Sequence, residues 1–399
     1  MPNPPNNTLT LGVVTTSFPV PSHPASGVFV ERLVAHLPAD IRVQVLIPCA
    51  DVPISSDNPT AYQLNCFRYG PRTWQRLAHR PGGLPEAWRR RDPALLLLPL
   101  FLPALFIGCL RLAGQVDLLH GNWSLPSLIA AIAARLRGKP AIATLRGADI
   151  NRAQDSWLFQ IMLRACLAWN IKIVVVSQAM HQQLQNQFAH YAKKIAFIPN
   201  GVAVPDHCSR TQWHHPYRLV TVGSLIPRKR LETILNALAH SAAPQDSQLR
   251  IIGDGPDRRA LEQLAAELGI SARVDFVGSL APEQVAAQLQ WADTFVFASE
   301  SEGRPNVILE AMAAGLPIMA TDIPGVTELL EPDAGCLYPV GEVAALADGL
   351  AHLHANPAFA LRLGSHARQR IEQSGLSWTA AGERYAELYR QALVEYGKN

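Results

Sequence analysis

The chain has 399 residues, enough for two or three domains of about 150 residues each. Hydrophobic residues make up 48% of the chain and charged residues only 17%, so it buries much surface or contacts something apolar. A net charge of +3, with no zinc-finger, helix-turn-helix or aromatic-basic motif, argues against a nucleic-acid partner.

The cysteines and the start of the chain indicate in which cellular compartment the protein resides. The six cysteines are scattered and form no C-x-x-C pair, which predicts reduced thiols in a cytoplasmic protein rather than a disulfide or metal framework. The first ten residues are polar and proline-rich and do not resemble a signal peptide, so export is not expected. The cysteines are Cys49, Cys66, Cys109, Cys166, Cys208 and Cys336.

The first elements suggest a parallel sheet with helices. Residues 9 to 16 are an apolar run that predicts the first strand, and residues 28 to 37 predict the helix that follows it. Ligands bind outside the carboxyl ends of such strands, where a glycine lets the backbone approach a phosphate. Gly27 is the candidate for that contact, or it is an ordinary helix-entry glycine.

A very apolar stretch spans residues 94 to 112. Pro99 and Pro103 interrupt it, and its unbroken apolar length falls short of the roughly 20 residues that cross a membrane, which predicts a buried or interfacial helix. One interpretation is core plus a solvated basic loop. The other is contact with anionic lipid headgroups by the arginines and tryptophans that precede the stretch. These are Arg72, Trp74, Arg76, Arg80, Trp88, Arg89, Arg90 and Arg91.

Two further predicted strands end in polar residues. Residues 117 to 120 close one strand at His120, which could equally be a satisfied core histidine. Residues 140 to 145 form the next strand and lead into Arg146, whose guanidinium can clamp a phosphate or carboxylate through two hydrogen bonds. Asp149 follows as a partner for an acceptor hydroxyl or as a structural residue.

The second half begins after a linker over residues 203 to 217, which is rich in His, Pro and polar residues. A strand over 219 to 222 leads into Arg228, Lys229 and Arg230, just before a helix over 231 to 239. Adjacent cations beside a helix N-terminus predict an anion site, with a charged surface loop as the alternative.

Residues 299 to 317 carry the most informative pattern. They lie between apolar strands and predict a helix that begins near Pro305 and stops at Gly315. Glu302 lies just ahead of this helix and Glu310 about two turns inside it. The positive end of the helix is therefore a seat for a phosphate or a sugar hydroxyl.

This stretch, E-G-x-P-x-x-x-x-E-A-M-A-x-G-x-P, resembles the donor-sugar motif of glycosyltransferase family 4. The resemblance implies the α/β GT-B fold, in which two Rossmann-like domains face each other across a cleft and a C-terminal helix crosses back to the N-terminal domain. It implies an acceptor-binding domain over residues 1 to 205, a nucleotide-sugar-binding domain over 206 to 376, and the crossing helix over 377 to 399.

The resemblance also carries over individual residues. Lys229 matches the lysine that binds the donor diphosphate, whereas Ser224 stands where the family has arginine, so Arg228 or Arg230 is only a substitute candidate. Arg146 stands where many members have histidine, so the proton-relay role of that histidine is not carried over. The implied catalytic residues are His120, Arg146, Asp149 and Glu302, and the implied donor-binding residues are Gly27, Arg228, Lys229, Gly278, Gly303, Arg304, Asn306, Val307 and Glu310.

The implied reaction moves a sugar from a nucleotide-diphosphate sugar to a saccharide or lipid-linked saccharide, with retention of configuration, in cell-surface polysaccharide or glycolipid synthesis. Attack from the front face, with the leaving phosphate accepting the proton, needs no metal and no cofactor. A cytoplasmic location, at the inner face of an anionic membrane, fits the apolar stretch. The alternatives are a nucleotide-sugar epimerase and a non-catalytic nucleotide-sugar-binding partner.

Overall fold

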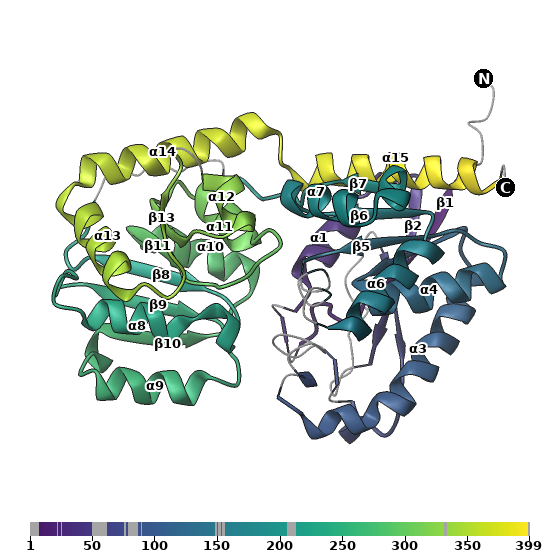
Figure 1. The fold of residues 1–399 in the computed structure, drawn as a ribbon, viewed down its shortest axis with the longest axis horizontal. Helices are drawn as coiled ribbons and strands as arrows, with labels where there is room; N and C mark the ends of the chain where they lie inside the picture. The colour runs from purple at the N-terminus through teal and green to yellow at the C-terminus, as the bar shows by residue number, and fades with distance from the viewer. Residues whose placement is uncertain are drawn as a thin grey trace. The chain divides into compact units, whose positions relative to one another are not determined.

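The computed structural model divides into two compact units, each with its own sheet and core (Figure 1). Unit 1 consists of Met1–Gly201 together with Trp378–Asn399, and unit 2 consists of Val202–Ser377. The described residues are 8–21, 23–24, 26–49, 62–75, 77–78, 87–88, 90–147, 150, 153, 156–205, 213–330 and 333–397.

Unit 1 contains a seven-stranded sheet in the order β3-β2-β1-β4-β5-β6-β7, with every pairing parallel. Its central strands are continuous apolar runs because helices cover both faces of the sheet. The strands are β1 (Leu9–Val14), β2 (Ile41–Pro48), β3 (Tyr62–Phe67), β4 (Leu118–Asn122), β5 (Ala141–Leu145), β6 (Lys172–Val175) and β7 (Ile195–Phe197). The helices are α1 (Val28–Ala35), α3 (Leu98–Ala113), α4 (Ser124–Leu136), α6 (Trp157–Trp169), α7 (Gln178–Gln187) and α15 (Trp378–Gly397), with 3-10 turns at Arg72–Trp74, Pro93–Leu97 and Ala189–Lys194.

The C-terminal helix α15 belongs to unit 1. It packs on α1, and its buried Tyr385 and Tyr389 join the apolar core on that face of the sheet. Gly382 lies so close to the backbone carbonyl of His36 that a Cβ atom would overlap it. A second core lies under α3 and α4 on the sheet. The prediction that the C-terminal helix returns to the N-terminal half is confirmed.

Unit 2 contains a six-stranded parallel sheet in the order β10-β9-β8-β11-β12-β13. Apolar clusters lie on both of its faces, as a doubly wound sheet requires. The strands are β8 (Arg218–Val222), β9 (Gln248–Ile252), β10 (Val274–Gly278), β11 (Thr294–Phe297), β12 (Ile318–Thr321) and β13 (Cys336–Tyr338). The helices are α8 (Leu231–Ala239), α9 (Arg258–Glu267), α10 (Pro282–Trp291), α11 (Asn306–Ala313), α12 (Pro324–Leu330), α13 (Val343–Ala355) and α14 (Pro357–Ser374), with 3-10 turns at Pro227–Lys229 and Ser271–Arg273.

The sequence did not predict two elements of unit 1. Strand β3 lies in a polar region with little alternation, and no residue of it except Phe67 is buried. Helix α6 exposes Trp157, Leu158 and Ile161 on its outer side, so apolar residues surround it and blur the helical period. Both elements occupy their places because tertiary packing outweighs local pattern.

The prediction that all cysteines are reduced thiols is wrong for one pair: Cys49 and Cys66 form a disulfide. Strands β2 and β3 pair in parallel, with Pro48 opposite Phe67, and the N–H of Cys49 donates to the carbonyl of Phe67 at 2.9 Å. This register brings Cys49 and Cys66 together, although their spacing in the sequence does not indicate a pair. Cys109, Cys166 and Cys336 are free thiols, and Cys208 lies outside the described residues.

Candidate functional site

The strand order of unit 2 reverses between β8 and β11, which pair with each other at the centre of the sheet. Strands β9 and β10 continue on one side, and β12 and β13 continue on the other. In open α/β sheets, ligands bind outside the carboxyl ends of the strands at such a switch point. The two loops that follow β8 and β11 are therefore the ligand-binding loops that the topology predicts.

These two loops meet through charged side chains. Glu302, in the loop after β11, accepts hydrogen bonds through Oε1 from Lys229 Nζ at 2.6 Å and from Arg228 Nη1 at 2.7 Å. Ser299 Oγ donates to the same carboxylate oxygen at 3.0 Å. Ser299 Oγ also lies 3.1 Å from the carbonyl oxygen of Arg228, and the N–H of Glu300 donates to the same carbonyl at 3.0 Å. Two predicted donor-binding residues and one predicted catalytic residue thus form one cluster.

Electrostatics fix the charge state of this cluster. Burial raises the pKa of Glu302, but the opposing attraction of Lys229 and Arg228 is stronger and holds that pKa at about 2. Burial lowers the pKa of Lys229, and its ion pair with Glu302 opposes that shift. Glu302 is therefore an ionised carboxylate at neutral pH, able to accept hydrogen bonds but not to donate a proton.

Helix α11 begins at Asn306, immediately after this loop, with Pro305 as its N-cap. Its positive end therefore lies next to the charged cluster, where an anionic group is stabilised. Gly325, in the first turn of α12, packs so closely on the carbonyls of Glu302 and Gly303 that no Cβ atom fits. The backbone of the loop therefore packs directly on the first turn of α12. Glu310 lies in α11 and is partly exposed.

Two other predicted donor-binding residues have partners within the protein. Arg304 donates to Glu328 in α12 at 2.8 Å, and both side chains are largely buried, so this guanidinium braces the loop against α12. Gly278, with φ of 87°, ends β10 and accepts from the N–H of Gly253 at 2.8 Å. Its carbonyl joins the turns that follow β9 and β10.

Unit 1 has a corresponding switch point between β1 and β4. The loop after β1 ends at Gly27, which caps α1 with φ of 63°. A Cβ atom at Gly27 would overlap the carbonyl of Ser17, so the turn accepts no larger residue. The sequence left open whether Gly27 contacts a phosphate, and its local geometry explains the glycine without one.

Arg146 lies directly after β5 and gathers polar groups from neighbouring segments. It donates to Asn122 Oδ1 from Nε at 3.2 Å and from Nη2 at 2.9 Å, and to Asn200 Oδ1 from Nη1 at 3.1 Å. Its guanidinium also lies 4.2 Å from the centre of the Phe29 ring. Arg146 is therefore held in one position by β4, α1 and the segment after β7.

His120 lies in the core. It is completely buried, Nε2 lies 2.8 Å from Thr144 Oγ1, and Nδ1 lies 2.8 Å from the hydroxyl of Tyr389 in α15. Burial, together with the positive charge of Arg146, lowers its pKa to about 3. These contacts match the core-histidine alternative, since both ring nitrogens have protein partners. We assign His120 to the packing of α15 on the sheet.

The sequence comparisons agree with this geometry. Residues 26–204 match the family profile described as Glycosyltransferase Family 4, and residues 210–370 match the one described as Glycosyl transferases group 1. The GDP-mannose-dependent alpha-mannosyltransferase of Mycolicibacterium smegmatis is 30% identical over 332 residues, which are 73% of this chain and 81% of that protein. The chain belongs to glycosyltransferase family 4. It is therefore an enzyme, a glycosyltransferase.

Other relatives of this glycosyltransferase support the same assignment. The GDP-mannose-dependent alpha-(1-6)-phosphatidylinositol monomannoside mannosyltransferase of Mycobacterium tuberculosis is 25% identical over 323 residues, 75% of this chain and 82% of that protein. Among solved structures, sucrose-phosphate synthase from Thermosynechococcus elongatus has a TM-score of 0.78 at 22% identity, covering 97% of this chain and all of that one. The predicted GT-B fold is confirmed.

Each unit of this glycosyltransferase also contains candidate site residues that the sequence did not single out. Ser299 holds both the Glu302 carboxylate and the Arg228 backbone, and Asn122 and Asn200 orient Arg146. Each of the three comes at or after the carboxyl end of a strand, which is the signal that could have drawn attention to them. Asp149, a predicted catalytic residue, lies outside the described residues.

Proposed function

We propose that this glycosyltransferase moves a hexose from a nucleoside diphosphate hexose to a glycan or lipid-linked glycan, with retention at the anomeric carbon. The observation that carries the proposal is the cluster of Lys229, Arg228 and Glu302 at the start of α11. It combines an anion-binding cation pair with an ionised carboxylate at the switch point of unit 2. A sugar diphosphate needs both kinds of group.

The cations serve the leaving group. As the glycosidic bond breaks, negative charge develops on the diphosphate, and preorganised positive groups stabilise that charge in the transition state. Lys229 and Arg228 are already held in place by Glu302 and by the carbonyl of Ser301, so little reorganisation is needed when the donor binds. The backbone at Asn306 and Val307, where α11 begins, adds the positive end of the helix dipole.

Glu302 serves the sugar. Because its pKa is about 2, it accepts hydrogen bonds from sugar hydroxyls and does not act as the general acid of a glycosidase, whose pKa is raised. Glu310, further along α11, fixes the donor. We assign neither carboxylate as a nucleophile, so retention follows from attack on the same face that the diphosphate leaves, with the leaving phosphate accepting the proton. We expect no metal and no cofactor in this step.

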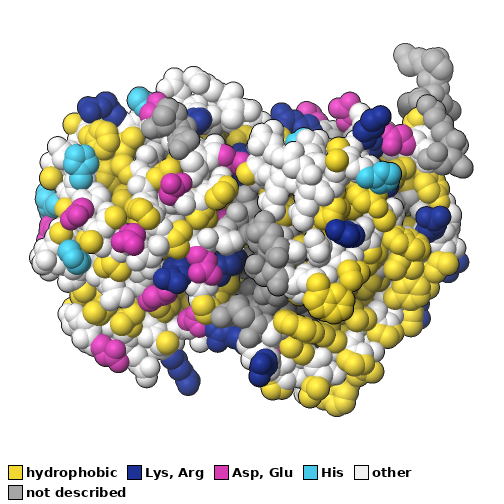
Figure 2. Space-filling view, in the orientation of Figure 1, with side chains coloured by type: hydrophobic (Ala, Val, Ile, Leu, Met, Phe, Trp, Pro, Cys, Tyr) yellow, Lys and Arg dark blue, Asp and Glu magenta, His cyan; other side chains and the backbone are white. Residues whose placement is uncertain are grey.

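We propose that the acceptor is presented at an anionic membrane on the cytoplasmic side, for the synthesis of a cell-surface polysaccharide or glycolipid. Most of the exposed large hydrophobic side chains of the described residues lie between positions 74 and 169 of unit 1. Figure 2 shows a broad apolar surface on that unit. We use the term apolar face for the exposed large hydrophobic side chains in this range, namely Trp74, Trp88, Leu96, Leu100, Ile107, Leu136, Trp157, Leu158, Ile161 and Trp169.

The apolar face has a simple structural origin. Among the described residues, one helical stretch, Pro93–Ala113, is long and apolar enough to cross a membrane by length and composition, with a mean hydropathy of 2.3. Phe101, Leu105 and Cys109 pack inward on the sheet, yet only 17% of an 18-residue apolar segment of the stretch is buried. The outer side of this stretch carries exposed apolar side chains, and so does the outer side of α6. Such surfaces fit lipid better than water.

Charge supports the same contact. Residues 62 to 169 contain fourteen Lys and Arg against five Asp and Glu, an excess of nine positive charges in a chain whose net charge is only +3. Arg135 lies 5.3 Å from the centre of the ring of Trp169, which pairs a cation with an exposed aromatic side chain. Basic residues near apolar helices attract anionic headgroups.

The transfer reaction is tested first with the donor. Binding of UDP-, GDP- and ADP-hexoses is measured by calorimetry, and release of nucleotide is then measured with and without EDTA. We expect one nucleotide series to bind in the micromolar to millimolar range, and we expect release to survive EDTA. Failure of every nucleotide sugar to bind would overturn the proposed donor site, and loss of release in EDTA would overturn the metal-free step.

The membrane contact is tested separately by co-sedimentation with phosphatidylcholine vesicles that contain or lack phosphatidylglycerol. We expect binding to the anionic vesicles at low salt and at least a tenfold loss in the double variant Trp157→Ser/Ile161→Ser. The control is Val394→Ser, because Val394 is 58% exposed on α15, outside the apolar face. If both variants bind the anionic vesicles equally well, the apolar face is not the membrane contact. Donor binding is measured in solution without vesicles, so that result leaves the proposed donor site untouched.

A further inference from the structure

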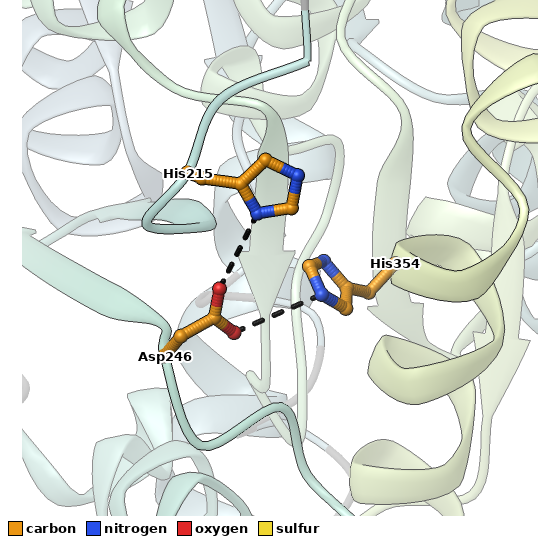
Figure 3. Close-up of side chains that lie close together, drawn as sticks. All are labelled: His215, Asp246 and His354. Atoms are coloured by element: carbon orange, nitrogen blue, oxygen red, sulfur yellow. Dashed lines mark hydrogen bonds and ion pairs between the residues drawn. The ribbon is translucent and has the colours of Figure 1, made fainter.

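Unit 2 contains a cluster of side chains that the transfer reaction does not use. His215, Asp246 and His354 point toward one another from three separate segments (Figure 3). His215 lies just before β8, Asp246 lies in the turn between α8 and β9, and His354 lies in the last turn of α13. Their potential ligand atoms all lie within 4.8 Å of one another.

The two histidines contact different oxygens of the Asp246 carboxylate, one through a long hydrogen bond and the other at a greater distance. His215 Nδ1 lies 3.4 Å from Asp246 Oδ2, and His354 Nε2 lies 3.7 Å from Asp246 Oδ1. The neighbouring His214 pairs with Asp293 at 2.7 Å, which is an ordinary hydrogen bond. Around a four-coordinate Zn²⁺ with bonds of about 2.0 to 2.2 Å, neighbouring ligand atoms lie about 3.3 Å apart.

Two of the three residues, Asp246 and His354, are held by their surroundings. In the turn before β9, Ser247 Oγ donates to the carbonyl of Pro244 at 2.6 Å, and Arg273 Nη2 donates to Ser247 Oγ at 2.6 Å, which fixes the turn that carries Asp246. The His354 ring lies 4.8 Å from the ring of the fully buried Tyr217, which limits its rotation. His215 is the most exposed of the three. A small rotation of its side chain would bring its ring nitrogen to the distance from the other two ligand atoms that a bound cation requires.

We propose that His215, Asp246 and His354 bind a zinc-type divalent cation. Two imidazole nitrogens and one carboxylate oxygen suit Zn²⁺ or Co²⁺, whereas Mg²⁺ and Ca²⁺ prefer oxygen ligands. Three protein ligands leave one position for water.

The position of the cluster indicates a structural role. Asp246 precedes β9 and His215 precedes β8, whereas Lys229 and Glu302 follow the carboxyl ends of β8 and β11. The cation therefore lies at the amino-terminal edge of the unit 2 sheet, opposite the donor-binding loops. It joins the segment that enters unit 2 to the end of α13 and stabilises the folded state, because the unfolded chain does not bring these ligands together.

The test uses the full chain without an affinity tag, stripped of metal with a chelator. Zn²⁺ is titrated by calorimetry, Co²⁺ binding is followed by its visible absorption, and thermal unfolding is measured with Zn²⁺ or Mg²⁺. We expect one Zn²⁺ per chain, the intense absorption of four-coordinate Co²⁺, and a higher Tm with Zn²⁺ but not with Mg²⁺.

The variants locate the site. Asp246→Asn and His354→Ala should each weaken Zn²⁺ binding at least tenfold and abolish the increase in Tm, while the rate of sugar transfer in EDTA stays unchanged. His352→Ala is the matched control, because His352 is an exposed histidine on the same helix. The proposal is overturned if the unaltered chain binds no Zn²⁺, or if His354→Ala and Asp246→Asn bind it as tightly as the unaltered chain does.

Discussion

Lys229 Nζ lies 2.6 Å from Glu302 Oε1, although 73 residues separate the two in the chain. The contact exists because β8 and β11 are neighbours in the sheet of unit 2, so that the loops at their carboxyl ends meet. Arg228 and Ser299 complete the cluster around the same carboxylate. The predictions about donor binding and acid stability depend on this contact.

Replacing Lys229 with alanine should weaken the donor site without unfolding the protein. The variant removes one positive group from the position of the leaving diphosphate, so kcat/KM should fall about 100-fold or more, as for the loss of one preorganised donor to a developing anion. Lys193→Ala, an exposed lysine of unit 1, is the control and should retain full activity. Steady-state kinetics with the preferred nucleotide sugar checks this, and an unchanged kcat/KM would remove Lys229 from the site.

Glu302→Gln should destabilise unit 2 at neutral pH. The glutamine leaves the charges of Lys229 and Arg228 without their carboxylate, and breaking a buried ion pair costs roughly 3 kcal/mol. The pKa of Glu302 is held at about 2, below its ordinary value of 4.5. Its ion pairs therefore contribute stability above about pH 4.5, and this contribution is lost as the pH falls toward 2.

Urea unfolding at a series of pH values measures this effect. The difference in unfolding free energy between the unaltered chain and Glu302→Gln should be constant from pH 5 to 8 and should shrink below pH 4.5. A difference that is the same at pH 3 as at pH 7 would contradict the assigned pKa.

His120 should lower stability in mild acid through its burial. Its pKa is about 3 in the folded protein and 6.5 ordinarily, so between these values the unfolded chain takes up a proton that the folded chain does not. Stability should fall as the pH drops from 6.5 toward 3, by up to about 1.4 kcal/mol per pH unit from this group. His120→Gln should lack that slope, whereas the exposed control His190→Gln should keep it.

Catalysis separates the two roles considered for His120. If it only packs between Thr144 and Tyr389, the pH dependence of kcat in His120→Gln should match that of the unaltered chain. Loss of a titration near neutral pH in the variant would restore a catalytic role.

The Cys49–Cys66 disulfide should stabilise unit 1 when it is formed. Cross-linking cysteines that are 17 residues apart restricts the unfolded chain and contributes about 3 kcal/mol. A thiol reductant should therefore lower the Tm of the oxidised protein and of Cys336→Ala, but not that of Cys49→Ala/Cys66→Ala. Intact mass before and after alkylation reports whether the pair is oxidised in cells, where a cytoplasmic location predicts reduction.

Part of the donor site could be predicted from local sequence patterns. The string from Glu302 to Pro317 identified a helix start with two carboxylates, and Lys229 stood out among cations beside another helix start. What could not be predicted is that Lys229 and Glu302 are partners. Ser299 was missed for the same reason, since its importance comes from the two loops that it joins.

His120 and Arg304 show the limit of residue-by-residue reasoning. Both residue types are common in active sites, and both positions lie near strand or helix ends. Their roles depend on Tyr389 and Glu328, which come from other elements of the fold. The disulfide of Cys49 and Cys66 likewise depends on the register of β2 and β3.

The sequence by itself determined the periodicity of most strands and helices, the glutamate motif before α11 and the basic loop before α8, because these are local patterns of side chains and backbone preference. The tertiary structure decided which loops meet at the switch point of each sheet, which apolar helices stay exposed on unit 1, and which distant residues, such as His215 and His354, become neighbours. Those outcomes depend on strand order and packing, which join residues far apart in the chain and leave no local mark on it.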